Sequence, residues 1–115
     1  MAYDEDLAQR IRELVATQEG LREQKMFGGI AFLVGGNLAI AASGRGGILV
    51  RVGPERSDRL VATTRAEVAV MGGRPMTGWL RVASEDLRTT RQLKPWVERG
   101  TSFARSLPAK TPSRA

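Results

Sequence analysis

Neighbouring acidic side chains are the first candidates for chemistry in this chain. Asp4-Glu5-Asp6 and Glu85-Asp86 could bind magnesium or act as a general acid and base. Both groups also stand where helix N-termini are expected, and the helix dipole favours acids there. The chain has no histidine and no cysteine, which excludes Ser-His-Asp and Cys-His catalysis and leaves zinc with carboxylate ligands alone. We therefore predict no enzymatic activity, no cofactor and no metal site.

Arginine side chains are the second set of candidates, because the chain has a net charge of +6 and a pI near 11. The loop at residues 43–47, SGRGG, could form an anion-binding nest around Arg45 or simply a hairpin turn. Arg74 follows a glycine pair and precedes a proline, so it could bind a phosphate or carboxylate or pair with a nearby acid. Arg45, Arg51, Arg74 and Arg81 are the predicted interaction residues.

Two tryptophans could serve either recognition or packing. Trp79 and Trp96 could offer stacking platforms for nucleic-acid bases. Trp96, however, lies on an apolar stripe at helical spacing, and Trp79 lies between a glycine and a strand. Core packing is therefore the preferred interpretation for both.

Paired glycines beside large apolar residues occur twice and define the structural motif of the chain. The first pair, Gly28 and Gly29, follows Met26 and Phe27. The second copy comprises Gly72, Gly73 and Pro75, a few residues before Trp79. Glycine adopts positive φ and allows close backbone approach, so each pair predicts a bulge or tight turn at a strand end.

Length and composition predict one globular domain. A chain of 115 residues with 42% apolar and 26% charged residues can bury a single core. We expect the domain to span residues 1–108 and residues 109–115 to form a flexible basic tail. The absence of cysteine suits a reducing compartment, the N-terminus lacks an apolar leader, and no apolar run is long enough to span a membrane. We therefore expect a cytoplasmic protein.

Apolar periodicity then predicts the elements that position these residues. Helices are expected over residues 4–18, over a short segment from 54 to 64, and from 90 to 107; strands are expected over residues 29–34, 38–42, 48–52, 67–71 and 76–83. The resulting order is α-β-β-β-α-β-β-α. This order predicts a two-layer α+β domain with an antiparallel sheet and helices on one face, although strand order stays open.

With these elements placed, the chain resembles the N-terminal domain of the TfoX/Sxy family of bacterial competence regulators. The resemblance rests on MFGG at residues 26–29, ILVRV at 48–52, GRPM and GWLRV within 73–82, and WV with ARSLP within 96–108. It covers nearly the whole chain and implies a secretion-chaperone-like α+β fold. It also implies a regulatory lineage, in competence or transcription, without catalytic residues.

These observations leave three functions open. The first is a non-enzymatic regulatory module that binds a protein partner. The second is a module that binds nucleic acid weakly and without sequence preference, which requires the four arginines to converge on one face. The third is a small ligand-binding protein or enzyme, which requires a pocket with convergent polar groups.

Overall fold

A computed structural model describes residues 4–26 and 28–108 of the chain. The helices are α1 (Glu5–Leu14), α2 (Pro54–Thr63) and α3 (Thr90–Ser106), with a short 3₁₀ turn, η1 (Ser84–Asp86). The strands are β1 (Leu21–Met26), β2 (Gly29–Val34), β3 (Asn37–Ala42), β4 (Ile48–Arg51), β5 (Glu67–Met71) and β6 (Arg74–Val82). The predicted α+β class and element order are confirmed, with β1 as a further strand before the predicted meander.

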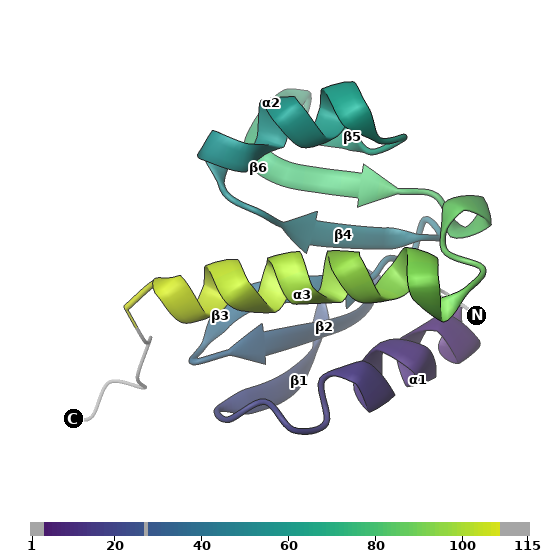
Figure 1. Ribbon diagram of the computed structural model, residues 1–115, viewed down its shortest axis with the longest axis vertical. Coiled ribbons are helices and arrows are strands. Elements are labelled where there is room, and N and C mark those ends of the chain that lie inside the picture. Colours follow the sequence, from purple (N-terminus) through teal and green to yellow (C-terminus); the bar gives the residue numbers. More distant parts are fainter. Residues whose placement is uncertain (1–3, 27, 109–115) are drawn as a thin grey trace.

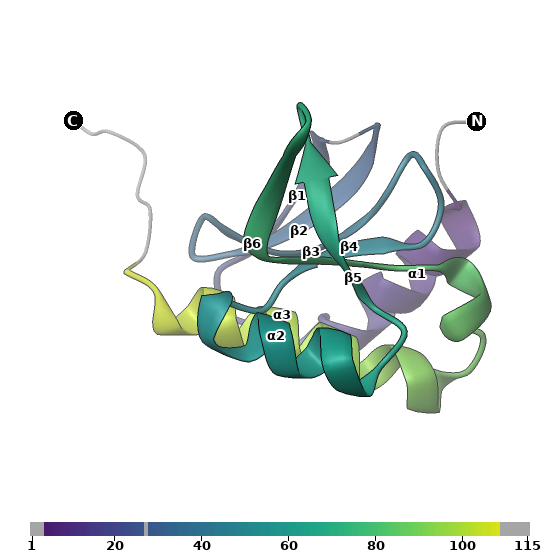
Figure 2. The ribbon, with the colours of Figure 1, turned by 90° about the horizontal axis from the view of Figure 1, so that it is seen from above.

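The strands form one antiparallel sheet in the order β1-β2-β3-β4-β6-β5 (Figure 1). The chain leaves β4, passes through α2, runs along the outer edge as β5, and returns as β6 beside β4. All three helices lie on the same side of this sheet (Figures 1 and 2). The predicted two-layer arrangement, with helices on one face, is therefore the one observed.

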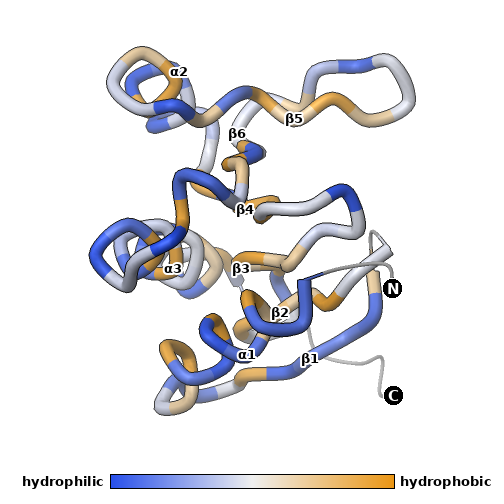
Figure 3. The backbone as a smooth tube through the Cα atoms, turned by 90° about the vertical axis from the view of Figure 1, so that its right-hand side faces the viewer, coloured by the Kyte–Doolittle hydropathy of each residue, from blue (hydrophilic) through white to orange (hydrophobic). Residues whose placement is uncertain are grey.

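The main core lies between the helices and the sheet. Alternate strand residues such as Phe32, Ile40 and Val50 point to this side and are fully buried. They meet the apolar stripes of α1 and α3, including Ile11 and Leu93. The end view in Figure 3 shows the helices stacked on one side of the strands.

The edge strand β1 is held by backbone pairing with β2 and by an ion pair with α1. Its four central residues are exposed, and it pairs with β2 along its whole length. Arg12 on α1 donates two hydrogen bonds to Glu23, at 2.6 and 2.9 Å. The hydrogen bond and charge of Arg12 lower the pKa of Glu23. This ion pair ties β1 to α1 across the helix-covered side.

The two glycine pairs have different structural causes. Gly72 and Gly73 have φ of 57° and 79° and form the two-residue turn between β5 and β6, as the sequence indicates. In the first pair only Gly28, at 72°, has positive φ. Gly29 is required for a different reason: a Cβ built there would overlap the carbonyl oxygen of Ala42. Phe27 and the predicted tail at 109–115 lie outside the described residues.

The start of α3 provides a local test of the fold. Thr89 accepts a hydrogen bond from the Gln92 amide at 3.1 Å, and the Gln92 side chain accepts one from the Thr89 amide at 3.0 Å. Because this capping box satisfies two helix-end donors, Thr89→Ala should lower the free energy of unfolding by about 1 kcal/mol. Urea unfolding measures this loss. Thr63→Ala, near the C-terminal end of α2, is the control, and an equal loss in both variants would contradict the capping argument.

Candidate interaction surface

Three of the four predicted interaction residues, Arg51, Arg74 and Arg81, lie on the side of the sheet opposite the helices. Strand alternation and cross-strand register place one set of side chains on it, which we call the helix-free face. It comprises Arg22, Gln24, Met26, Ala31, Leu33, Leu38, Ala41, Leu49, Arg51, Glu67, Ala69, Met71, Arg74, Met76, Trp79 and Arg81. Its centre is apolar, and its charges lie around that centre.

Alanine and leucine residues at the centre of this face are buried although no helix covers them. Ala31, Ala41 and Leu49 have no exposed surface. Figure 2 shows why: the sheet curls, so the β1–β2 and β5–β6 ends rise on the side away from the helices. Four half-buried side chains pack on this second cluster, and they are Met26, Met71, Met76 and Trp79. The face therefore presents three methionines and one indole above a buried layer of alanine and leucine.

Arg81 lies on β6 within this face and has an incomplete set of partners. Its Nη1 donates to Ser43 Oγ at 3.1 Å, while its Nε is buried without a hydrogen-bond acceptor. Burial, followed by the charge of Arg45, lowers the pKa of Arg81. Glu67 is its cross-strand neighbour on β5, yet these two described residues form no ion pair. The guanidinium is thus partly desolvated beside a second cation.

Arg51, at the end of β4, is positioned by aromatic rings. Its guanidinium carbon lies 5.2 Å from the centre of the Trp79 ring and 5.4 Å from that of Phe103 on α3. Both distances fall within the cation–π range. Within the described chain Arg51 meets no carboxylate. The two rings hold its charge in place at the boundary of the helix-free face.

The other two predicted arginines lie on loops or turns. Arg45 belongs to the loop that joins β3 to β4, where its amide donates to Ser43 Oγ at 3.1 Å. The Ser43 amide donates to the Gly47 carbonyl at 3.0 Å, so the nest candidate closes as a hairpin loop. Arg74 follows the β5–β6 turn opposite Met71 and is exposed. Arg45 and Arg81 thus share Ser43 Oγ as a hydrogen-bond acceptor. Arg51 is the diagonal neighbour of Arg81 on the adjacent strand, and Arg74 lies apart at the hairpin tip.

The two tryptophans lie on opposite sides of the sheet. Trp96 is 6% exposed within the main core, and Arg99 lies over its ring at 4.6 Å. Trp79 is half-buried on the helix-free face. Met71, Met76 and Ser43 were not among the predicted interaction residues, although Met71 shares its side of β5 with buried Ala69. That alternation is the sequence signal that could have identified Met71.

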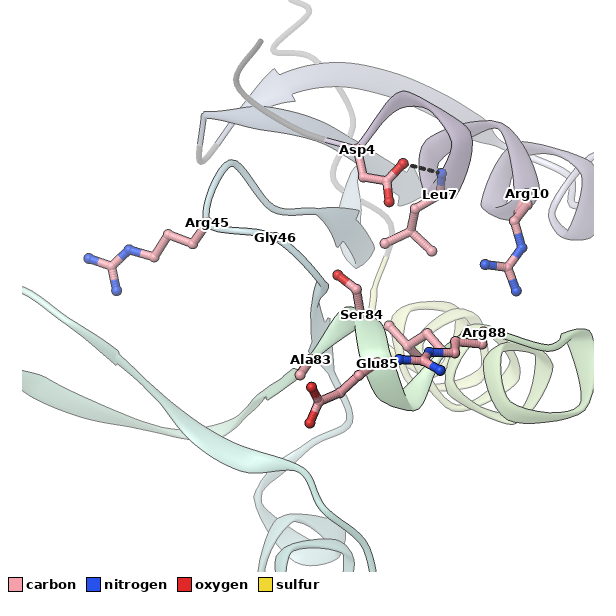
Figure 4. A pocket seen from close by; sticks show the side chains of 10 residues that line it. Asp4, Leu7, Arg10, Arg45, Gly46, Ala83, Ser84, Glu85 and Arg88 are labelled. Atoms are coloured by element: carbon pink, nitrogen blue, oxygen red, sulfur yellow. Dashed lines mark hydrogen bonds between the residues drawn. The ribbon is translucent and has the colours of Figure 1, made fainter.

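Two of the carboxylates considered for catalysis, Asp4 and Glu85, line an open hollow of about 690 Å³ where α1, the β3–β4 loop and η1 meet (Figure 4). Asp4 accepts from the Leu7 amide at 3.0 Å and caps α1. Glu85 lies across the hollow, and Arg45 extends away from both. No group of three possible metal ligands occurs among the described residues. Asp4 caps α1 and Glu5 and Asp6 lie in its first turn, as the dipole argument predicts. Glu85 and Asp86 lie instead in the short turn η1, where Asp86 pairs with Arg65 at 3.8 Å.

The sequence matches the family described as TfoX N-terminal domain over residues 13–104. The chain belongs to the TfoX N-terminal domain family. The match runs from α1 into α3, so this TfoX N-terminal domain includes every strand of the helix-free face. The family is a non-catalytic one, and no curated protein matches the chain. Among the described residues of the domain, no helix is long and apolar enough to cross a membrane.

Proposed function

We propose that this TfoX N-terminal domain is a non-enzymatic regulatory module of the cytoplasm that binds a protein partner through its helix-free face. The observation that carries the proposal is the combination of half-buried Met71, Met76 and Trp79 with Arg51 and Arg81, neither of which meets an acid in the described chain. Methionine, tryptophan and arginine are enriched at protein interfaces. Methionine also adapts its shape to a partner.

A second candidate, nucleic-acid binding, is favoured by one specific observation. Arg51, Arg74 and Arg81 share one face, and Arg45 adjoins it. The centre of that face is methionine, leucine and alanine, which offer no acceptors or donors to bases. We therefore expect only weak, salt-sensitive contact with phosphates, with a Kd of about 10⁻⁴–10⁻⁶ M at physiological salt.

Affinity capture with two matched variants tests the protein-binding role. Met76→Asp places an acid on the helix-free face, whereas Val70→Asp places one on the opposite side of the same hairpin, where Val70 is 49% exposed. The tagged wild type and Val70→Asp should recover the same protein from the native host. Met76→Asp should recover at least about tenfold less of that protein, because a buried charge disfavours an apolar contact.

Two readouts make this result decisive. Circular dichroism melting checks that Met76→Asp remains folded, and Met76→Gln serves in its place if it does not. Mass spectrometry of protein and sequencing of nucleic acid are applied to the same captures. A partner retained by both helix-free-face variants, or recovery of nucleic acid alone, would contradict the proposal.

A further inference from the structure

The charges of the helix-free face are strongly one-sided. It holds the four arginines Arg22, Arg51, Arg74 and Arg81 against the single acid Glu67, and Arg45 lies beside Arg81. We infer that this face binds an acidic, extended segment of a protein partner, with a partner carboxylate received at Arg81 between Ser43 and Arg45. The inference rests on the proposed protein-binding function and specifies the chemistry of the partner.

The local geometry at Arg81 favours an anion. One buried hydroxyl, Ser43 Oγ, accepts hydrogen bonds from the Arg45 amide and from Arg81 Nη1, so the backbone of Arg45 and the guanidinium of Arg81 meet at one residue. The positive charge of Arg45 also acts on Arg81. A single neutral acceptor compensates little of the repulsion and desolvation of Arg81. A carboxylate would compensate both, since charge-assisted hydrogen bonds to guanidinium are among the strongest in proteins.

The spacing of the arginines favours an extended segment. Leu49 pairs with Arg81 and Arg51 pairs with Trp79, so Arg51 and Arg81 are diagonal neighbours on adjacent strands. The Cα atoms of such diagonal neighbours lie about 7–8 Å apart. Residues two apart in an extended segment are separated by about 6.5–7 Å and face the same side. Acids at alternate positions of one segment therefore match the two arginines.

The apolar part of the face distinguishes a protein segment from a nucleic acid. Met71 lies opposite Arg74, and Met71 and Met76 pack on the cluster that contains buried Ala69. They can receive aliphatic side chains that continue the acidic segment. Nucleic-acid bases would instead require exposed aromatic faces. Of the described aromatic residues, Trp79 alone belongs to this face, and Arg51 already lies over its ring.

Matched peptides test the inference by fluorescence anisotropy. The probe is a labelled eight-residue peptide with two glutamates at alternate positions, then two leucines at alternate positions, and serine between them. A control peptide has the same sequence with both glutamates replaced by glutamine. A single-stranded thymidine oligonucleotide of the same length is the third probe. We expect the glutamate peptide to bind at least about tenfold more tightly than the glutamine peptide.

Two protein variants test whether the preference for the glutamate peptide depends on Arg81. Arg81→Gln should abolish the preference for the glutamate peptide, whereas Arg59→Gln, which removes an equal charge from exposed α2, should preserve it. Equal binding of the two peptides, an unchanged preference in Arg81→Gln, or tighter binding of the oligonucleotide would overturn the inference. If the peptides bind equally while Met76→Asp still loses its cellular partner, the acidic inference fails and the proposed function stands. If that partner is also retained, both fail.

Discussion

Trp96→Ala is expected to lower the free energy of unfolding by about 3–5 kcal/mol, enough to unfold a domain of ordinary stability. Trp96 is 6% exposed and belongs to the main core between α3 and the sheet. α3 lies across β3 and β4 at the centre of the molecule (Figure 1), so a cavity there weakens the contact between the two layers. Urea unfolding followed by circular dichroism measures the loss.

Trp79→Ala is the matched control, because it removes the same side chain from the opposite side of the sheet. Trp79 is half-buried and packs on the smaller cluster. Its removal should cost less than half as much as that of Trp96. Acrylamide quenching gives a second readout, in which the Trp96 fluorescence of Trp79→Phe should be protected. Full accessibility of Trp96 to quencher would contradict its place in the core.

Gly29→Val is expected to cost about 2–4 kcal/mol, because the added side chain has no space at the beginning of β2. A Cβ on Gly29 would overlap the Ala42 carbonyl oxygen and crowd the Gly44 amide. Both neighbours are backbone atoms, so the β2–β3 pairing must shift to accommodate a side chain. The urea midpoint should fall accordingly.

The control for this prediction is Gly72→Ala in the second glycine pair. Gly72 has φ of 57°, but a Cβ there would meet no atom within 4 Å. Its replacement carries only the cost of the left-handed conformation, about 1–2 kcal/mol. If Gly29→Val were no more destabilising than Gly72→Ala, the close approach of the two strands would not explain Gly29.

The sequence predicts α3 well because its signals are local. Its apolar stripe, its Thr89 cap and Pro108 just beyond its end all lie within the segment itself. β1 carries no comparable signal, since its central residues are exposed on both sides. It forms through backbone pairing with β2 and through the Arg12–Glu23 ion pair, and both depend on tertiary contacts. The predicted helix over 4–18 is shorter in the structure, ending at Leu14.

The helix-free face was predictable only in part, because its arrangement also depends on tertiary contacts. Arg51, Arg74 and Arg81 can be singled out from their strand and turn positions, and alternation assigns each to a side of its own strand. The placement of β6 between β4 and β5 is a long-range choice, as is the packing of Met26, Met71 and Met76 on one buried cluster. The partnerless state of Arg81 Nε likewise depends on packing that no local pattern encodes.

Photo-crosslinking from two adjacent residues of β5 tests the central claim most directly. Met71 packs on the helix-free face, whereas Val70 lies on the other side of the strand and is exposed. A photoreactive phenylalanine analogue is placed at each position and activated in cells of the native host. If the helix-free face binds a protein partner, a protein crosslink forms from position 71 and is absent from position 70. Equal crosslinks from both positions, or a crosslink from position 70 alone, would contradict it.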